Sequence, residues 1–121
     1  LQILRGGAFS TLFVPNLLPI TRGMLVSAFG VLQKSVDAEA VLREFYANEP
    51  FVRVRSEPVS IKNVAGTHFC DIFVKTAGDK IWINSAIDNL LRGASSQAVA
   101  NANLMCGFAE DTALPRIAHG I

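Results

Sequence analysis

This 121-residue sequence has few charged residues and few cysteines, and both scarcities exclude classes of protein. Charged side chains make up 17% of it, whereas about 25% is usual in a soluble domain. The 11 Lys and Arg against 10 Asp and Glu give a formal net charge of +1, so no net charge indicates nucleic acid or an anionic membrane as a partner. Half of the residues are hydrophobic, which excludes a disordered chain.

Two cysteines, Cys70 and Cys106, are too few for a disulfide framework and favour a reduced, cytoplasmic setting. The sequence has no signal peptide and no membrane-spanning run, because Pro15 and Pro19 interrupt an uncharged stretch. It begins at Leu1 without an initiator Met, and we expect it to be the back half of a longer protein.

Three common motifs are also missing from the sequence. It contains no G-x-x-x-x-G-K-[ST], no G-x-G-x-x-G and no G-x-S-x-G, the patterns of phosphate loops, dinucleotide folds and hydrolase elbows. The residues alone therefore predict no catalytic set, and they favour a binding or dimerising domain.

The alternation of apolar residues predicts five strands and two helices. We expect strands at 8–14, 24–32, 51–55, 67–75 and 80–87, with a hairpin turn at 76–79, and helices at 37–47 and 89–107. The first helix has Asp37 as its N-cap and a Glu39–Arg43 pair. The expected buried stripes are Ala38, Val41, Leu42 and Phe45 on the first helix and Leu90, Ala94, Ala98, Ala102 and Met105 on the second.

These elements predict an α+β fold, a mostly antiparallel sheet with helices on one face, formed by residues 1–121 as a single domain. The strand at 24–32 is apolar on both sides, with Leu25 and Phe29 on one and Met24 and Val26 on the other. A strand of this kind needs cover on both faces. We expect an identical subunit to supply the second cover.

Several residues are candidates for chemistry. His68 and Cys70 lie two apart on one strand face, as a thiolate with a base or as a buried cysteine beside a polar residue. Their spacing of about 7 Å favours the second interpretation. A metal set of His68, Cys70, Cys106 and His119 lacks the paired spacing of zinc modules. Asp71, in an apolar strand, is either a perturbed carboxylate or a hydrogen-bonded structural one.

Arg22 follows a proline-rich loop, where its guanidinium either holds a carboxylate or phosphate or forms a structural ion pair. Residues 92–97 place small side chains near a helix start, where N–H groups favour anions but small residues also serve packing.

Four segments in order resemble the C-terminal domain of the semialdehyde dehydrogenases that reduce N-acetyl-gamma-glutamyl phosphate. They are FVPNLLPITRG at 13–23, YANEPFVRV at 46–54, VAGTHFCDI at 64–72, and SAIDNLLRGASSQAV at 85–99 with NLM at 103–105. The resemblance covers roughly residues 10 to 113. It implies a glyceraldehyde-phosphate-dehydrogenase-like C-terminal domain that mediates subunit contact.

The resemblance also implies an enzyme of arginine biosynthesis with two domains. Such an enzyme reduces an acyl phosphate with NADPH, through a thioester on a cysteine, to an aldehyde and phosphate. The family's nucleophilic cysteine belongs to a nucleotide-binding domain that is absent here, and its histidine motif has no match before Ala8. The 121 residues alone are therefore expected to be inactive.

By the same resemblance, Arg22 orients the substrate charge, and Asn89, Gly93 and Gln97 lie near the nicotinamide end of NADP. Asn16 stands where many relatives have histidine, and Ser95–Ser96 where Ala-Gly is common. Expected partners are the N-terminal domain and a second copy, as a homodimer or homotetramer through the sheet face, with no nucleic acid or membrane. Two alternatives stay open: the related reductase of carrier-protein-linked lysine biosynthesis, and a non-enzymatic homodimerisation module.

Overall fold

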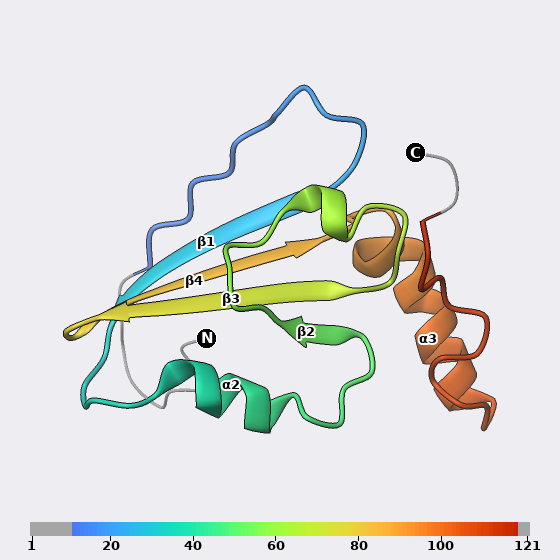
Figure 1. The fold of residues 1–121 in the computed structure, drawn as a ribbon. Helices are drawn as coiled ribbons and strands as arrows, with labels where there is room; N and C mark the ends of the chain where they lie inside the picture. Colours follow the sequence, from blue (N-terminus) through green and yellow to red (C-terminus); the bar gives the residue numbers. More distant parts are fainter. Residues whose placement is uncertain (1–10, 119–121) are drawn as a thin grey trace.

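The computed structural model describes residues 11–118 and contains one four-stranded sheet (Figure 1). The strands lie in the order β1, β4, β3, β2; β1–β4 and β4–β3 are antiparallel, and β2–β3 is parallel. Their bounds are β1 Met24–Val31, β2 Val52–Val54, β3 Cys70–Ala77 and β4 Lys80–Ile87. The helices are α2 Ala38–Phe45, the 3₁₀ turn η1 Ile61–Asn63, the π-helical turn η2 Leu91–Ser95 and α3 Ser96–Met105. The α+β prediction is confirmed.

The prediction of a strand at 8–14 is wrong where it can be checked. Residues 8–10 lie outside the described residues, and residues 11–14 form no strand. Leu12, Phe13 and Val14 are all exposed, and no strand in the described part of the chain pairs with them. A segment with high β-propensity forms a strand only where another strand can pair with its backbone N–H and C=O groups. Residues 11–14 have no such neighbour among the described residues, so their propensity alone does not produce a strand.

The β3–β4 hairpin forms where the sequence predicts it. Ala77 pairs with Lys80, which leaves Gly78 and Asp79 as a two-residue loop. Gly78 has a φ of 63°, and a glycine with positive φ at the first loop position is typical of a turn that matches strand twist. Because this signal is local, the hairpin could be predicted from the sequence. The loop is shorter than the predicted turn at 76–79, since Thr76 and Ala77 still belong to β3.

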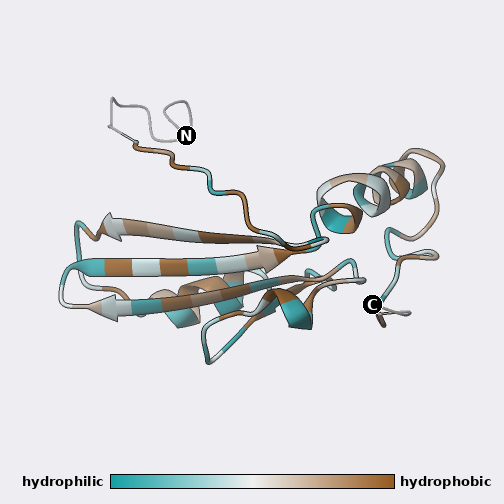
Figure 2. Ribbon diagram, turned by 90° about the horizontal axis from the view of Figure 1, so that it is seen from above, coloured by the Kyte–Doolittle hydropathy of each residue, from teal (hydrophilic) through white to brown (hydrophobic). Residues whose placement is uncertain are grey.

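The two faces of the sheet are covered differently. The segment between β2 and β3, which contains η1, crosses one face, and α2 lies on the opposite side against β3 and β2 (Figures 1 and 2). Between the η1 segment and the sheet lies a core cluster of Val59, Val64, Phe73 and Ala86, packed against Phe69 and Trp82. All eight residues of β1 remain exposed, and the hydropathy colouring of Figure 2 shows apolar residues along this strand.

Helix α2 confirms its predicted N-cap and ion pair but not its predicted stripe, and it ends at Phe45, two residues before the predicted end. The Asp37 side chain accepts a hydrogen bond from the Ala40 N–H at 3.0 Å, and Arg43 pairs with Glu39 at 2.7 Å. Of the expected stripe only Ala38 is fully buried, and Phe45 is 75% exposed. The neighbouring strand β2 has only three residues, so the sheet beneath the helix is too narrow to cover the whole stripe.

The expected stripe of the second helix is also wrong. Leu90, Ala94, Ala98, Ala102 and Met105 are exposed, and the buried residues of α3 are Ser96, Ala100 and Asn103. The π-helical turn η2 inserts i→i+5 hydrogen bonds, including Ser95 N–H to the Leu90 carbonyl, which rotate the faces that follow. Asn103 then donates to the carbonyls of Glu110 and Thr112, and Ala100 joins Phe51 and Leu114 in a second core cluster.

Candidate functional site

Asp88 is the centre of the best-connected polar site in the described residues. It follows the last residue of β4 and is completely buried. Its Oδ1 accepts hydrogen bonds from the backbone N–H groups of Leu90 and Leu91, both at 2.9 Å. Its Oδ2 accepts one from the Gly66 N–H at 2.7 Å and one from Arg22 Nη1 at 3.3 Å. One carboxylate therefore joins three segments that are far apart in sequence.

The electrostatics of the site favour the ionised form of Asp88. Burial alone raises the pKa of this carboxyl, because it withdraws the charge from water. The hydrogen bonds from Gly66, Leu91 and Leu90, together with the Arg22 charge, outweigh burial and lower the pKa below its ordinary value. Asp88 is thus a stable anion and not a proton donor at neutral pH.

A second contact fixes the same loop beside Asp88. The side-chain oxygen of Asn89 accepts a hydrogen bond from the Gly23 N–H at 2.6 Å. Gly23 has a φ of 109°, and a Cβ on it would collide with the side chain of Ile61. Only glycine tolerates both conditions, so the loop before β1 is held against the start of η2 by backbone shape as well as by side chains.

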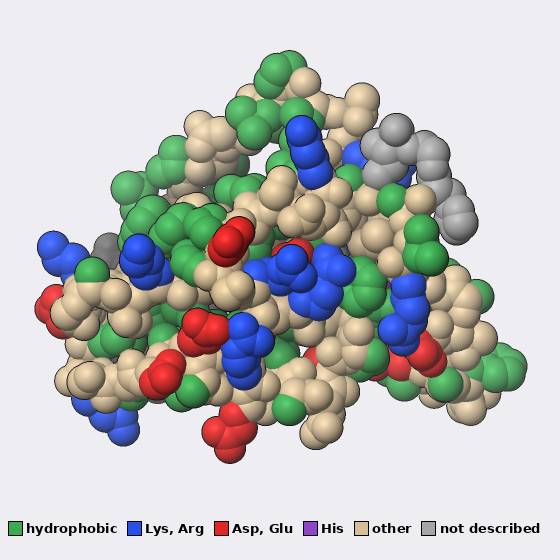
Figure 3. Space-filling view, in the orientation of Figure 1, with side chains coloured by type: hydrophobic (Ala, Val, Ile, Leu, Met, Phe, Trp, Pro, Cys, Tyr) green, Lys and Arg blue, Asp and Glu red, His purple; other side chains and the backbone are tan. Residues whose placement is uncertain are grey.

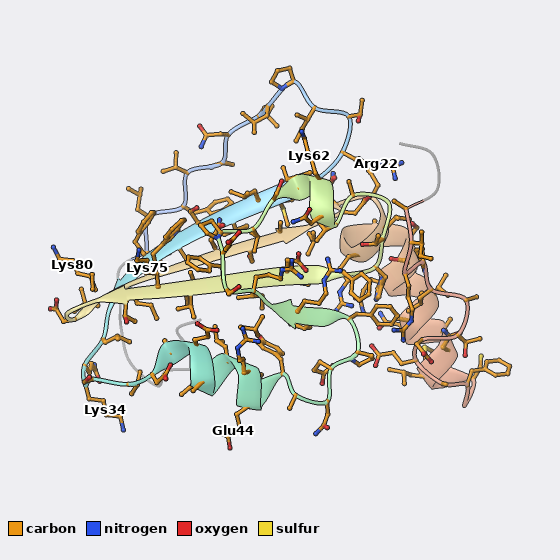
Figure 4. The ribbon with its side chains drawn as sticks, viewed as in Figure 1. Arg22, Lys34, Glu44, Lys62, Lys75 and Lys80 are labelled. Carbon is orange, nitrogen blue, oxygen red and sulfur yellow. The ribbon has the colours of Figure 1, made fainter. Side chains whose placement is uncertain are left out.

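Arg22 lies at this junction, at the end of the loop that leads into β1 (Figure 4). Its side chain is 34% exposed while its partner Asp88 is buried. The ion pair that the sequence left open is therefore present. The pair involves Nη1, whereas a guanidinium has five N–H donors in a planar fork, so pairing with Asp88 and binding an anion are compatible.

The other predicted site residues lie on the helix that starts at Asp88. The Gly93 N–H donates to the Asp88 backbone carbonyl at 3.1 Å within the π-helical turn. Gln97 lies one turn further, in α3, where its amide donates to Asn101 at 3.4 Å. The structure therefore gathers Arg22, Asn89 and Gly93 around Asp88, whereas the side chain of Gln97 contacts Asn101 further along α3.

His68 and Cys70 do not form a thiolate–base pair. His68 precedes β3, is completely buried, and its Nδ1 lies 2.5 Å from the Ser96 hydroxyl. Burial, and then the nearby Arg92 charge, lower the pKa of His68 to about 4. Burial also raises the pKa of the Cys70 thiol. A neutral thiol beside a histidine occupied with Ser96 supports the structural interpretation of both residues.

The set of two histidines and two cysteines, which the sequence disfavours as a metal site, lies only partly within the described residues. Residues 11–118 contain no group of three or more potential ligands that could hold a metal ion. One member of the set, His119, lies outside the described residues.

Asp71 is a structural carboxylate. It is completely buried on β3, and Arg53 from the neighbouring strand β2 donates to its Oδ1 at 2.6 Å. The Arg53 guanidinium also lies 4.1 Å from the ring centre of Phe69 and donates to the carbonyl of Asn63. Figure 3 shows basic side chains gathered in the middle of this face. The second interpretation of Asp71, a hydrogen-bonded structural residue, is the one that the structure supports.

Sequence reasoning missed Asp88 as the centre of the site. The available signal was its place as an aspartate directly after an apolar strand and before a helix, the pattern of an N-cap. That pattern predicts the contacts to the Leu90 and Leu91 amides. It does not predict the contacts to Gly66 and Arg22, because these arrive from distant parts of the chain.

Comparison with known proteins gives concordant matches. The family described as "Semialdehyde dehydrogenase, dimerisation domain" matches residues 1–89. Proteins named N-acetyl-gamma-glutamyl-phosphate reductase are similar: 66% identical in Campylobacter hominis over 98% of this chain, 66% in Wolinella succinogenes over 88%, and 69% in Campylobacter curvus over 93%. The chain covers 36%, 32% and 33% of these relatives, so it spans about a third of their length.

Proposed function

Because this chain belongs to the semialdehyde dehydrogenase dimerisation-domain family, we propose that it is the C-terminal part of an N-acetyl-gamma-glutamyl-phosphate reductase of arginine biosynthesis. The single observation that carries this proposal is the 66% identity to a protein of that name over 98% of the chain. The remaining two thirds of such an enzyme would include a nucleotide-binding domain.

The proposed reaction converts an acyl phosphate, NADPH and a proton into an aldehyde, phosphate and NADP. Neither Cys70 nor His68 is suited to act as its nucleophile or its acid–base group. Cys70 is a strand residue whose thiol pKa is raised by burial, and His68 is buried against Ser96. We therefore propose that the nucleophilic cysteine and the acid–base histidine lie outside this chain, and that the chain alone is inactive.

The start of η2 suits the nicotinamide end of NADP better than its pyrophosphate. The Asp88 carboxylate accepts the first N–H groups of the turn, and its negative charge opposes a pyrophosphate at this position. Asn89 and Gln97 carry amide groups, and Gly93 is exposed and has no side chain. These features fit the carboxamide of the nicotinamide, which supplies the hydride, and leave the phosphates to the proposed N-terminal domain.

Arg22 is proposed to hold the negative charge of the substrate. The partly exposed guanidinium sits beside Asn89 and Gly93 across Asp88, so the substrate and the nicotinamide would meet at one junction. An arginine is suited to carboxylate and phosphate groups because its N–H donors match their planar geometry.

The apolar faces of β1 support assembly with a second copy. Phe29 is 79% exposed and stacks on Trp82, and Leu25 and Val31 on the same face are also exposed. Figure 3 shows hydrophobic side chains over β1 and the segment before it. Exposed apolar area of this kind marks an interface. We propose a homodimer or homotetramer through this sheet.

The proposed setting is the cytoplasm. Both cysteines are free thiols, as a reducing compartment would keep them. No helix in residues 11–118 is long and apolar enough to cross a membrane.

A reductase assay on the full-length protein tests the proposal. NADPH oxidation with N-acetyl-glutamyl 5-phosphate is expected, together with an assembly larger than one chain in light scattering. Activity only with a carrier-protein-linked acyl phosphate would assign the protein to lysine biosynthesis instead. An assembled protein with no activity on either substrate would favour the non-enzymatic homodimerisation module.

A further inference from the structure

We propose that Asp88 is a positioning residue of the substrate site, whose carboxylate orients the Arg22 guanidinium and holds the loop of Arg22 and Gly23 against the start of η2. This inference deepens the proposed function and rests on it. It assigns a role to a residue that touches neither substrate nor cofactor in that proposal.

The contacts divide cleanly between the two carboxylate oxygens. Oδ1 accepts only from the helix start, through the Leu90 and Leu91 amides, and acts as a local cap. Oδ2 accepts from Gly66 and from Arg22, which belong to two other segments. Oδ1 thus caps the start of the helix, and Oδ2 holds Gly66 and Arg22 at the site.

All four partners of Asp88 are donors. An Asn at this position would keep one oxygen for the helix cap but would point an NH₂ group at the Gly66 N–H and at Arg22 Nη1. Donors that face one another lose their hydrogen bonds. The substitution Asp88→Asn therefore separates the two roles, since it preserves the cap and removes the hold on Arg22.

Orientation matters at Arg22 because its surroundings are irregular. Residues 19–23 form bends and no regular element, and a long side chain on such a loop has many rotamers to lose when it binds a ligand. The buried Asp88 removes part of this freedom beforehand. Binding to a group that is already in place retains more of the interaction energy.

The fixed geometry of the loop supports the same role. The Asn89 contact to Gly23 and the positive φ of Gly23 hold the backbone next to Arg22, so Asp88 needs only to orient the side chain. Backbone and side chain are thus both fixed by residues at the start of η2.

A kinetic cycle in the full-length enzyme tests the inference. Asp88→Asn is expected to raise the KM for the acyl phosphate by about tenfold, with the KM for NADPH changed far less. Arg22→Ala is expected to have an effect of similar size, and the double variant no more than either alone, because both remove one interaction. Asp111→Asn is the matched control, since Asp111 pairs with Arg116 at the surface and should leave both constants unchanged.

Chemical rescue provides a second measurement if the Asp88 variant does not fold. Guanidinium ions added to Arg22→Ala are expected to restore activity several-fold by binding beside the intact Asp88, whereas potassium chloride at equal ionic strength restores none. An absence of rescue, an unchanged acyl-phosphate KM in Asp88→Asn, or losses that multiply in the double variant would overturn the inference. Absence of activity in the wild-type enzyme would overturn the proposed function instead.

Discussion

Two buried aspartates in this chain hold an arginine in different ways. Asp71 and Asp88 are both completely buried, and their arginines are similarly exposed, Arg53 at 32% and Arg22 at 34%. Arg53 is bound at 2.6 Å between adjacent strands and is fixed further by Phe69 and Asn63. Arg22 lies on a loop, and its Nη1 is 3.3 Å from Asp88 Oδ2. Three backbone N–H groups also donate to the Asp88 carboxylate. The first pair is a fixed part of the sheet, whereas the second holds the arginine that we propose to bind the substrate.

The largest expected effect comes from breaking the first pair. Asp71→Asn should lower the free energy of unfolding by about 3 kcal/mol, at the low end for a broken buried pair because Arg53 can turn toward water. Denaturant unfolding measures the change, with Asp111→Asn as the surface control. A loss below about 0.5 kcal/mol would mean that the hydrogen bond to Asp71 adds little to the sheet.

The next largest effect is a loss of stability at mildly acidic pH, where His68 matters and the buried Asp88 does not. The pKa of His68 falls from 6.5 to about 4 on folding, so the unfolded chain binds the proton first as the pH decreases. Stability should therefore fall by about 2 kcal/mol between pH 7.5 and pH 5. The contribution of Asp88, whose pKa is lowered, persists through this range and is lost only as the pH falls through its folded-state pKa.

Unfolding midpoints at the two pH values, for wild type and for His68→Asn, measure this change. The variant should show a flatter pH dependence, because Asn cannot be protonated. Isotope-labelled imidazole spectra that show His68 titrating near pH 6.5 would contradict the prediction.

A smaller effect, in kinetics and not in stability, contrasts the two arginines directly. Arg22→Ala should reduce kcat/KM for the acyl phosphate about tenfold, equivalent to about 1.4 kcal/mol, with little loss of stability. Arg53→Ala should do the reverse, since it leaves Asp71 buried without its closest partner. Steady-state kinetics and thermal unfolding of both variants check this. Equal kinetic losses would remove the distinction between the two pairs.

The elements that the sequence predicted well depend on neighbours in the chain. The Asp37 cap, the Glu39–Arg43 pair and the hairpin turn within 76–79 each involve residues within four positions. The predicted face of the second helix was wrong because the π-helical turn η2 rotates the residues that follow it, and Ser96 then meets His68 from a distant part of the chain. Arg22 could be named from its place after a proline-rich loop, but Asn89 only through a family resemblance. Asp88 was missed because a cap pattern does not show which remote donors reach it.

The smallest expected effect belongs to an ion pair with both partners at the surface. Arg43 and Glu39 lie 2.7 Å apart on α2, and both side chains are exposed. Water and salt screen such a pair, so Glu39→Gln should cost only about 0.3–0.5 kcal/mol and less in high salt. Denaturant unfolding at low and high ionic strength measures this value. Burial, and not distance, then decides which pair stabilises the fold, because this contact is almost as short as the 2.6 Å contact between Arg53 and the buried Asp71. A loss as large as that of Asp71→Asn would contradict this ranking.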